Sequence, residues 1–369
     1  MRFAYFLLII FSFSLYNLAK AETQPKCVIE HAAGVDFTCL RQWYSQAPAL
    51  WPAPFIEENI TWTELAALPE QALSPESNPF TEAKRALGEK LFFDPLLSGS
   101  KQVSCASCHE PRLAFADARR VSIGHAQQEG RRNAPSVVAS SLFELLFWDG
   151  RKASLEEQAL APIIDPVEMA FSIQELEHRL QADSTYIAYF EQVFHDKPKA
   201  IYVGQALATY QRSLLPKDTD FERFMQGQNT ALSDQALYGL HLFRTKGRCL
   251  NCHQGAALSD QQFHNLGLTY YGRKYEDLGR YEVTAKAEDV GAFRTPSLRL
   301  VSRTGPWMHN GLFPNLEGIL NMYNAGMPTI TPNAEQIKDP LFPKKSPLLQ
   351  PLQLNSDELF ALKAFLQSL

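Results

Sequence analysis

The stretch Cys105-Ala106-Ser107-Cys108-His109 decides the fold of this chain, and it recurs as Cys249-Leu250-Asn251-Cys252-His253. Both stretches read Cys-x-x-Cys-His, the spacing with which c-type haem is attached to a polypeptide. Two thiols one turn apart can add to the two vinyl groups of one porphyrin, and the adjacent histidine then reaches the iron. A structural zinc site would need further Cys or His ligands at short spacing, and neither motif has them nearby. The sequence therefore predicts two covalently attached haem c groups, with His109 and His253 as the proximal iron ligands.

The regions that flank the two motifs match each other along the chain. A run from Thr81 to Phe92 and a run from Ser233 to Phe243 each begin with a favoured helix N-cap residue. Each run ends in Gly-x-x-Leu-Phe ahead of a motif. Their amphipathic pattern predicts two helices that pack apolar side chains on the haems.

Further matches follow each motif. The matching stretches are Arg132-Asn133-Ala134-Pro135-Ser136 with Arg294-Thr295-Pro296-Ser297, and Asp149-Gly150 with Asn310-Gly311, followed at equal spacing by Leu155-Glu156 and Leu316-Glu317. Matches that recur in the same order indicate an internal duplication, and strand signals are sparse. The sequence therefore predicts a mainly α fold of two tandem cytochrome c-type haem domains, residues 81–232 and 233–369.

The first 80 residues differ from this pattern. Residues 1–21 combine a short basic start, an apolar run and a small-residue cleavage site at Ala19-Lys20-Ala21, which predicts a signal peptide. The apolar run is short for a spanning helix, so no stable membrane insertion is expected. Residues 22–80 are rich in Pro and Trp and show no sustained helical period, which predicts an irregular extension across the main body.

Cysteine use and net charge limit the compartment and the partners. Four of the six cysteines belong to the two motifs, which leaves Cys27 and Cys39 as the simplest disulfide pair in an oxidising compartment. Export to a bacterial periplasm also suits haem c, which is attached to exported chains. The net charge of −5 and the lack of a basic patch argue against nucleic-acid binding. A mildly acidic surface is compatible with docking of a basic electron-carrier protein.

The duplication predicts a difference between the two haems. Twelve residues after Gly150 the chain carries Pro162, and twelve residues after Gly311 it carries Tyr323. Both positions are expected on the far side of their haem from the proximal histidine, and tyrosine can ligate iron whereas proline cannot. We therefore expect one haem closed by His253 and Tyr323, and one haem with room for a small molecule.

Residues 81–369 resemble the bacterial dihaem cytochrome c peroxidases and their MauG-type relatives. Besides the two haem motifs, the residues that carry the resemblance are Phe147-Trp148-Asp149-Gly150-Arg151, Leu155-Glu156-Glu157-Gln158 and Asp165-Pro166-Val167-Glu168-Met169. The resemblance implies that the haem on His109 is peroxidatic and that the haem on His253 transfers electrons.

The same resemblance implies roles for individual side chains. Glu168 matches the catalytic acid/base, Gln158 matches its distal hydrogen-bonding partner, and Trp148 matches the tryptophan between the haems. The chemistry agrees, because cleavage of a peroxide O–O bond needs a proton moved from one oxygen to the other, and one carboxylate can do both halves. Gln158 can donate a hydrogen bond to peroxide without adding charge.

Further residues match metal ligands of the family. His125 matches the histidine that caps the peroxidatic iron in the resting oxidised peroxidases. Asn133, Thr304 and Pro306 match the positions that hold an inter-domain calcium ion. The resemblance thus adds Ca²⁺ to the two haems as an expected cofactor.

Position 323 separates the two branches of the family. The resemblance implies methionine at this position in the peroxidases and tyrosine in the MauG-type enzymes. Tyr323 therefore points to the MauG-type branch, whereas His125 points to the peroxidases. Met322 is an alternative ligand that a small helix rotation would present, and Met327 is a more remote one.

Three functions follow from these residues. The first is a periplasmic peroxidase that reduces hydrogen peroxide to water, with electrons from a small cytochrome c or copper redox protein passed from the second haem by way of Trp148. The second is a MauG-like enzyme that uses peroxide-derived high-valent haems to oxidise side chains of a partner protein. The third is a non-enzymatic electron carrier or peroxide sensor. Whether the chain forms a homodimer stays open.

Overall fold

The structure is a computed structural model that describes residues 25–32 and 34–369. The predicted signal peptide, residues 1–21, lies outside the described residues. The fold is mainly α, as predicted. Its helices are α2 (Phe37–Tyr44), α3 (Glu82–Phe93), α4 (Leu155–Ile164), α5 (Ile173–Gln181), α6 (Ser184–Phe194), α7 (Ala200–Ser213), α8 (Asp220–Met225), α9 (Asp234–Arg244), α10 (Tyr281–Thr284), α11 (Leu316–Asn324) and α12 (Ser356–Gln367). Two antiparallel strand pairs join them, β1 (Glu30–His31) with β2 (Gly34–Val35) and β3 (Phe263–His264) with β4 (Phe293–Arg294).

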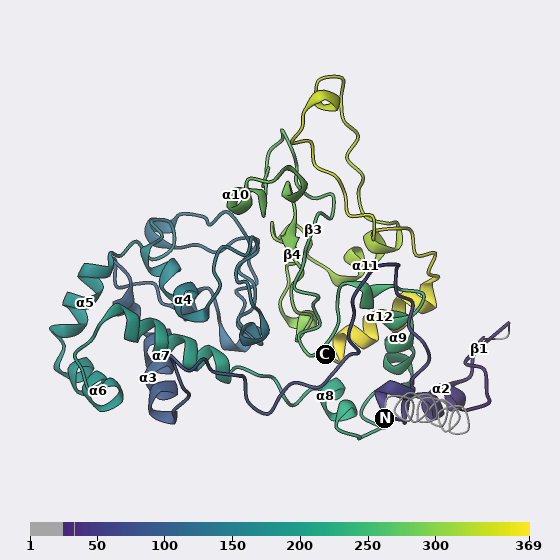
Figure 1. The fold of residues 1–369 in the computed structure, drawn as a ribbon, viewed down its shortest axis with the longest axis horizontal. Coiled ribbons are helices and arrows are strands. Elements are labelled where there is room, and N and C mark those ends of the chain that lie inside the picture. Colours follow the sequence, from purple (N-terminus) through teal and green to yellow (C-terminus); the bar gives the residue numbers. More distant parts are fainter. Residues whose placement is uncertain (1–24, 33) are drawn as a thin grey trace, which may run out of the picture.

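Each half of the molecule is built on one pair of packed helices, α3 with α7 and α9 with α12 (Figure 1). A Cβ at Gly88 of α3 would come within 1.9 Å of the Ala206 carbonyl oxygen. A Cβ at Gly239 of α9 would come within 2.0 Å of the Ala361 carbonyl oxygen. The glycine of each Gly-x-x-Leu-Phe run therefore allows the two helices to approach closely.

Side-chain caps start the equivalent helices of both halves. Thr81 caps α3 and Ser233 caps α9, as the sequence predicts, and Ser154 and Asn315 cap α4 and α11. Each cap accepts a hydrogen bond from the backbone N–H three residues later, which satisfies a donor that the first helical turn leaves free. The repeat in the sequence is thus also a repeat in the local structure.

The two halves have separate hydrophobic cores, and the N-terminal extension belongs to the second. Leu40, Tyr44, Trp51 and Leu65 are buried in the same cluster as residues of α9 and α12. The first half has its own cluster, formed largely by α3, α4, α6 and α7. The predicted boundaries after residues 80 and 232 stay a prediction, but the extension shares a core with the second half.

The extension is more regular than its sequence suggests. The 8 residues of α2 are helical, so the prediction of an irregular segment is wrong there. The reason is local: Asp36 accepts a hydrogen bond from the Cys39 N–H at 2.9 Å and starts a helix too short for its period to be read from the sequence. A disulfide joins Cys27 to Cys39, with 5.7 Å between their Cα atoms, which agrees with the predicted pairing.

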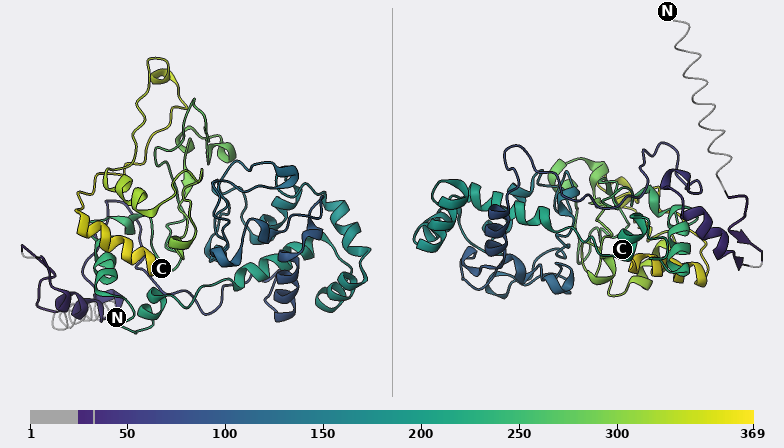
Figure 2. Two further views of the ribbon diagram at one scale, coloured as in Figure 1. Left: turned by 180° about the vertical axis from the view of Figure 1, so that it is seen from behind. Right: turned by 90° about the horizontal axis from the view of Figure 1, so that it is seen from below.

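Residues 52–80 form a strap that runs from the second half to the first (Figures 1 and 2). Asn251 and Gln254, inside and just after the second motif, accept hydrogen bonds from strap N–H groups at 2.8 and 2.6 Å. At the other end of the strap, Asn78 donates to the Glu156 carboxylate of α4 at 2.7 Å. The strap therefore ties the second haem motif to the first half.

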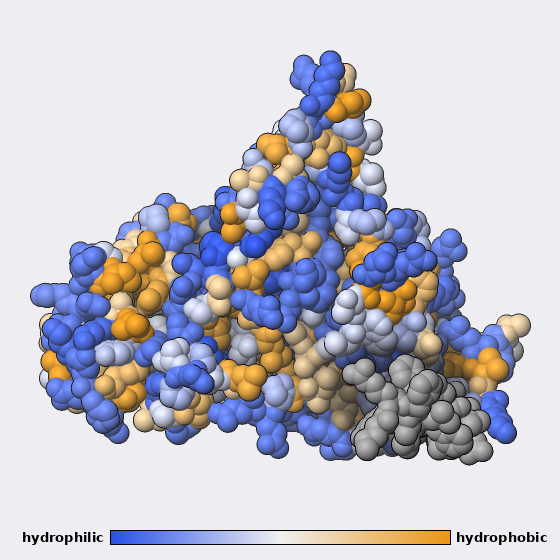
Figure 3. Space-filling view, viewed as in Figure 1, coloured by the Kyte–Doolittle hydropathy of each residue, from blue (hydrophilic) through white to orange (hydrophobic). Residues whose placement is uncertain are grey.

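The outer surface is mixed in character. On the face drawn in Figure 3, apolar residues form separate patches among hydrophilic ones. Three of the exposed apolar side chains, Phe55, Trp62 and Leu73, belong to the strap. Within residues 25–32 and 34–369, none of the helices has the length and apolar character needed to cross a membrane.

Candidate haem sites

Both Cys-x-x-Cys-His stretches form the same short turn. Cys105–Ser107 and Cys249–Asn251 are 3-10 turns. The N–H of the following histidine donates to the carbonyl of the first cysteine, at 2.9 Å for His109 and 2.8 Å for His253. All four thiols are free of disulfides. Each turn thus presents two thiols and an imidazole from one short stretch, which suits covalent attachment of a haem.

Both imidazoles are oriented by a backbone carbonyl. Nδ1 of His109 lies 3.1 Å from the Phe115 oxygen, and Nδ1 of His253 lies 2.9 Å from the Leu258 oxygen. A hydrogen bond at Nδ1 selects the tautomer that leaves the Nε2 lone pair available to a metal. Burial lowers the pKa of both imidazoles, which keeps them neutral and able to ligate. These residues fit two haem irons.

The second turn faces a largely apolar cavity of about 250 Å³. The wall of this cavity contains Cys249, Cys252, His253 and Tyr323 of the second half. It also contains residues of the first half, namely Asn133, Pro135, Ser136, Val138, Ser140, Phe143 and Trp148. The cavity beside the second turn is therefore shared between the halves.

Tyr323 is the predicted ligand that lies in this cavity with His253. Met322 is not among the lining residues, and Met327 is buried outside the lining. Burial raises the pKa of the Tyr323 phenol, so the phenol keeps its proton unless a metal ion displaces it. The geometry favours Tyr323 over Met322, while ligation itself stays a prediction.

In the first half, the loop that carries His125 packs against Glu168. The His125 N–H lies 2.9 Å from the Val167 oxygen and 2.8 Å from the Glu168 oxygen. Gly124 permits this contact, because a Cβ there would lie 2.2 Å from the Val167 oxygen. Nδ1 of His125 is buried without a hydrogen-bond partner among the described residues. His125 and Glu168 are thus neighbours, as their predicted roles require, although capping of an iron stays a prediction.

The Glu168 carboxyl also lies near the first haem turn. Burial raises the pKa of the Cys105 thiol to about 12, and the charge of Glu168 contributes to that rise. Burial raises the pKa of Glu168 itself as well, with Asp165 acting in the same direction and Arg151 opposing. A carboxyl with a raised pKa beside this turn is suited to proton transfer.

Gln158 and Pro162 lie on α4. Oε1 of Gln158 accepts a hydrogen bond of 3.4 Å from Nε2 of Gln211 on α7. Pro162 occupies the place in α4 that Tyr323 occupies in α11, after equivalent N-caps. The repeated helix thus offers an oxygen ligand in the second half and none at the matching place in the first.

Trp148 lies where the two halves meet. Its Nε1 donates to the Asn133 carbonyl at 2.9 Å, and its ring is edge-on to that of His309, with 6.5 Å between centroids. The His309 ring in turn stacks on Phe293 at 3.6 Å. Trp148 therefore contacts both halves, in agreement with a place between two haems.

The three predicted calcium ligands all lie on the wall of one cavity. Asn133, Thr304 and Pro306 line the cavity described above. The Asn133 N–H donates to the His309 carbonyl at 2.8 Å, which joins the two halves at this point. Calcium binding stays a prediction.

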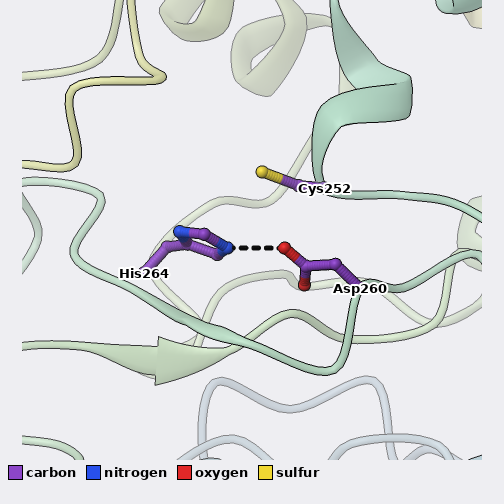
Figure 4. A group of neighbouring side chains, drawn as sticks. All are labelled: Cys252, Asp260 and His264. Atoms are coloured by element: carbon purple, nitrogen blue, oxygen red, sulfur yellow. Dashed lines mark hydrogen bonds and ion pairs between the residues drawn. The ribbon is translucent and has the colours of Figure 1, made fainter. Parts of the chain in front are cut away.

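A second group of possible metal-binding side chains lies beside the second turn. Cys252, Asp260 and His264 offer ligand atoms within 4.8 Å of one another (Figure 4). Nε2 of His264 lies 2.7 Å from the Asp260 carboxylate. Because the Cys252 sulfur is the predicted point of haem attachment, we interpret the His264–Asp260 pair as support for that haem and not as a separate metal site.

Neither Arg294 nor His309 was predicted from the sequence as a ligand or a catalytic residue. Both line the cavity, and their exposed fractions are 8% and 4%. The internal repeat did contain a signal for Arg294. Arg294 stands two residues before Pro296, and the matching position in the first half, two residues before Pro135, is Asn133, which was predicted as a site residue. For His309, as for His264, the sequence suggested only a place along the second haem or its propionates and not the role of a ligand.

Comparison with known proteins agrees with this geometry. Residues 82–230 match the family described as di-haem cytochrome c peroxidase. The chain is 35% identical over 325 residues to cytochrome-c peroxidase IdrP1 of Denitromonas iodatirespirans, which covers 80% of this chain and 83% of that protein. It is 38% identical over 273 residues to methylamine utilization protein MauG of Methylorubrum extorquens, which covers 71% of this chain and 76% of that protein.

Solved structures lead to the same class. A MauG-like protein associated with microbial copper homeostasis superposes with a TM-score of 0.73 at 30% identity, covering 82% of this chain and 94% of that one. Fold and motifs together define a dihaem oxidoreductase. The chain belongs to the family of dihaem cytochrome c peroxidases and MauG proteins. It is a cytochrome c peroxidase-like enzyme, and membership of this family implies two haem groups.

Proposed function

We propose that this protein reduces hydrogen peroxide to water, with electrons that a small redox protein delivers through the haem on His253. One hydrogen peroxide, two protons and two electrons give two water molecules. The observation that supports the proposal is the difference between α4 and α11. Tyr323 shares a cavity with His253, whereas α4 carries Pro162 at the matching place. In this proposal α11 provides a ligand for the second iron, whereas α4 provides none for the first. The haem on His109 is therefore open to peroxide.

Glu168 and Gln158 handle the peroxide in this proposal. The Glu168 carboxylate takes a proton from one oxygen of hydrogen peroxide and returns it to the other, so that the leaving oxygen departs as water. Gln158 donates a hydrogen bond that positions the substrate. Because burial raises the pKa of Glu168, its carboxyl holds a proton more readily near neutral pH than an exposed glutamate does.

The haems are held by thioether bonds from the two cysteine pairs, with His109 and His253 as proximal ligands. When bound, the haems supply the iron at which peroxide reacts and the redox centres that carry electrons. In this proposal Trp148 would pass electrons between the halves, and His125 would cap the first iron only at rest and leave it when peroxide binds. A calcium ion held by Asn133 and residues of the second half would join the halves further.

The electron donor in this proposal is a small basic cytochrome c or copper protein. Residues 42–83 contain six glutamates and no lysine or arginine. Glu57, Glu64 and Glu82 form ion pairs with arginines outside this segment, whereas Glu58, Glu70 and Glu76 are exposed and are in none of the ion pairs of the described residues. The strap within this segment is bonded directly to Asn251 and Gln254 beside the second turn. An acidic surface next to the second haem would attract and orient a basic partner.

Export to the periplasm is part of the proposal. The Cys27–Cys39 disulfide and the two Cys-x-x-Cys-His motifs both suit an oxidising compartment outside the cytoplasm. Cell fractionation, with N-terminal sequencing of the mature chain, tests this point. A mature chain that begins near residue 22 and is recovered with periplasmic markers is the expected result.

A second candidate function follows from Tyr323. A phenolate ligand favours higher iron oxidation states, which suits a MauG-like enzyme that oxidises side chains of a docked partner protein. In this case peroxide is the oxidant, and the electrons come from the partner protein.

Steady-state kinetics separates the two candidates. Peroxide consumption is measured with a reduced basic cytochrome c, and absorption spectra are recorded after peroxide is added to the diferric protein. Fast turnover supports the peroxidase. Slow turnover with a long-lived altered spectrum supports the MauG-like enzyme. A protein that does not respond to peroxide at all would refute both and leave an electron carrier.

A further inference from the structure

Arg294 of β4 is a buried cation without a counter-ion. Its exposed fraction is 8%, and no carboxylate among the described residues forms an ion pair with it. The guanidinium donates only to backbone oxygens, those of Phe147 and Thr295, both at 3.3 Å. Burial lowers the pKa of Arg294 to about 10. A charge removed from water without a partner is strongly disfavoured, so a folded protein normally supplies an anion.

Arg132 of the first half is a largely buried arginine that the fold does provide with anions, from both halves. Arg132, in the matching stretch, is 11% exposed at its side chain and forms ion pairs with Asp149, Asp277 and Glu282. Two other buried arginines, Arg244 and Arg299, are paired with glutamates. The unpaired state of Arg294 is therefore not the general condition of buried arginines in this molecule.

The surroundings of Arg294 indicate where its anion would lie. Arg294 lines the cavity that contains Cys249, Cys252, His253 and Tyr323. The Ser140 hydroxyl and Nε2 of His309 line the same cavity, and both are buried without hydrogen-bond partners among the described residues. Unsatisfied polar groups on the wall of one otherwise apolar cavity indicate a ligand that is apolar in its body and anionic at its edge.

We propose that Arg294 binds a propionate carboxylate of the haem attached at Cys249 and Cys252, an inference that rests on the proposed dihaem function. A haem has this combination of an apolar ring and carboxylates at its edge. The planar guanidinium can bind a carboxylate with two parallel hydrogen bonds. Ser140 and His309, on the wall of the same cavity, would offer further hydrogen bonds to this haem.

Arg294 also holds the segment that carries Trp148. The Arg294 N–H donates to the Trp148 carbonyl at 2.8 Å, and its guanidinium lies over the Phe143 ring at 3.7 Å from the centroid. One residue of the second half thus contacts the cavity and the backbone of Trp148. Arg294 is a positioning residue: it links the edge of the second haem to Trp148, and its positive charge stabilises the reduced form of that haem.

The test is a redox titration of the second haem in the holoprotein, followed by absorption spectroscopy, with resonance Raman spectra of the propionate bending modes. Arg294→Gln removes the charge, and we expect a lower midpoint potential for the second haem and a shifted propionate band. Arg294→Lys keeps the charge, so most of the potential should be restored while the propionate band still shifts. If Arg294→Gln does not fold, the propionate band of Arg294→Lys alone tests the proposal.

Arg280→Leu is the matched control. Arg280 also crosses between the halves, since it donates to the Asp149 and Gly150 carbonyls at 2.8 and 3.0 Å, but it does not line the cavity. This variant should leave the potential and the band unchanged. Unchanged values in Arg294→Gln, or an unshifted band in Arg294→Lys, would overturn the proposal, as would an equal shift in Arg280→Leu. The titration uses neither peroxide nor a protein donor, so failure of the peroxidase proposal would not affect it.

Discussion

In the first half, α4 carries Gln158 and Pro162, and the loop with Glu168 follows. In the second half, the equivalent helix α11 carries Tyr323 into the cavity of His253. The helix packing of the two halves is nearly the same, since a Cβ added at Gly88 of α3 or at Gly239 of α9 would lie 1.9 or 2.0 Å from a carbonyl oxygen of the partner helix. The halves therefore share the scaffold and differ in the polar groups around the haem position.

This difference shows how a duplicated fold can divide two tasks. Packing at the crossing of helices tolerates little change, because a single added carbon would overlap a backbone oxygen. The residue one helix presents to a haem is less restricted, and Pro162 and Tyr323 differ there. In the proposed function, one half then binds substrate while the other carries electrons.

The largest effect is expected from Glu168→Gln, which tests the catalytic half of the comparison. Removal of the acid/base should lower peroxide turnover by about 10²–10⁴-fold and leave both haems attached. Turnover is measured with a reduced donor, and haem content is measured by absorption. Glu157→Gln, an exposed neighbour on α4, should retain parent activity. Equal turnover in Glu168→Gln and parent would remove Glu168 from the mechanism.

A large loss of stability is expected from Arg299→Met, which tests how the second half holds the strap. Arg299 and Glu222 are each 1% exposed, and they bind the strap at the Ala66 oxygen and the Leu68 N–H. Leaving Glu222 buried and unpaired should lower the free energy of unfolding by about 3–5 kcal/mol. Denaturant unfolding followed by fluorescence measures the loss.

The control for this variant is Lys363→Met, which breaks a surface ion pair with Glu317 exposed to 69%. Its loss should stay below about 1 kcal/mol. A loss of similar size in both variants would show that the buried pair does not hold the strap.

A smaller loss is expected from alanine at each helix crossing. Gly88→Ala and Gly239→Ala should each lower stability by about 1–3 kcal/mol, because the added carbon forces a shift of the partner helix. Thermal unfolding followed at the haem absorption band measures both. Gly130→Ala, where the nearest atom lies 3.5 Å away, should be close to neutral. Unequal losses in the two crossing variants would mean that the halves are less alike than their backbones suggest.

The smallest effect on stability is expected from Tyr323→Met, which makes the second half resemble the peroxidases. The methionine sulfur introduced at position 323 should raise the potential of the second haem and change its spectrum, since methionine ligation raises haem potentials. A redox titration measures the change, and Met322→Leu should leave the potential as in the parent. If instead Met322→Leu shifts the potential and Tyr323→Met does not, then Met322 is the ligand.

Much of the site could be predicted from the sequence because its parts are local. The two cysteines and the histidine of each motif lie within one turn, so their spacing alone brings them together. The N-caps Thr81 and Ser233 act on N–H groups three residues away and were predicted for the same reason. The place of Glu168 near the first turn came from a resemblance and not from spacing, because more than 50 residues separate it from Cys108.

Other features could not be predicted, since they depend on contacts between distant segments. The strap is bonded to Asn251 and Gln254 across more than 190 positions of the chain. α2 was missed because a single capping carboxylate starts a helix too short to show a period.

The sequence by itself determined that the protein is a duplicated haem-binding chain, because thiol and imidazole spacing within a turn is a local property. Only the tertiary structure decided which charged groups have partners. The sequence does not distinguish Arg132 from Arg294. In the structure, Arg132 forms ion pairs with three carboxylates, whereas Arg294 lines a cavity. The physical reason is that neutralisation of a buried charge depends on what the rest of the fold brings within a few ångströms of it.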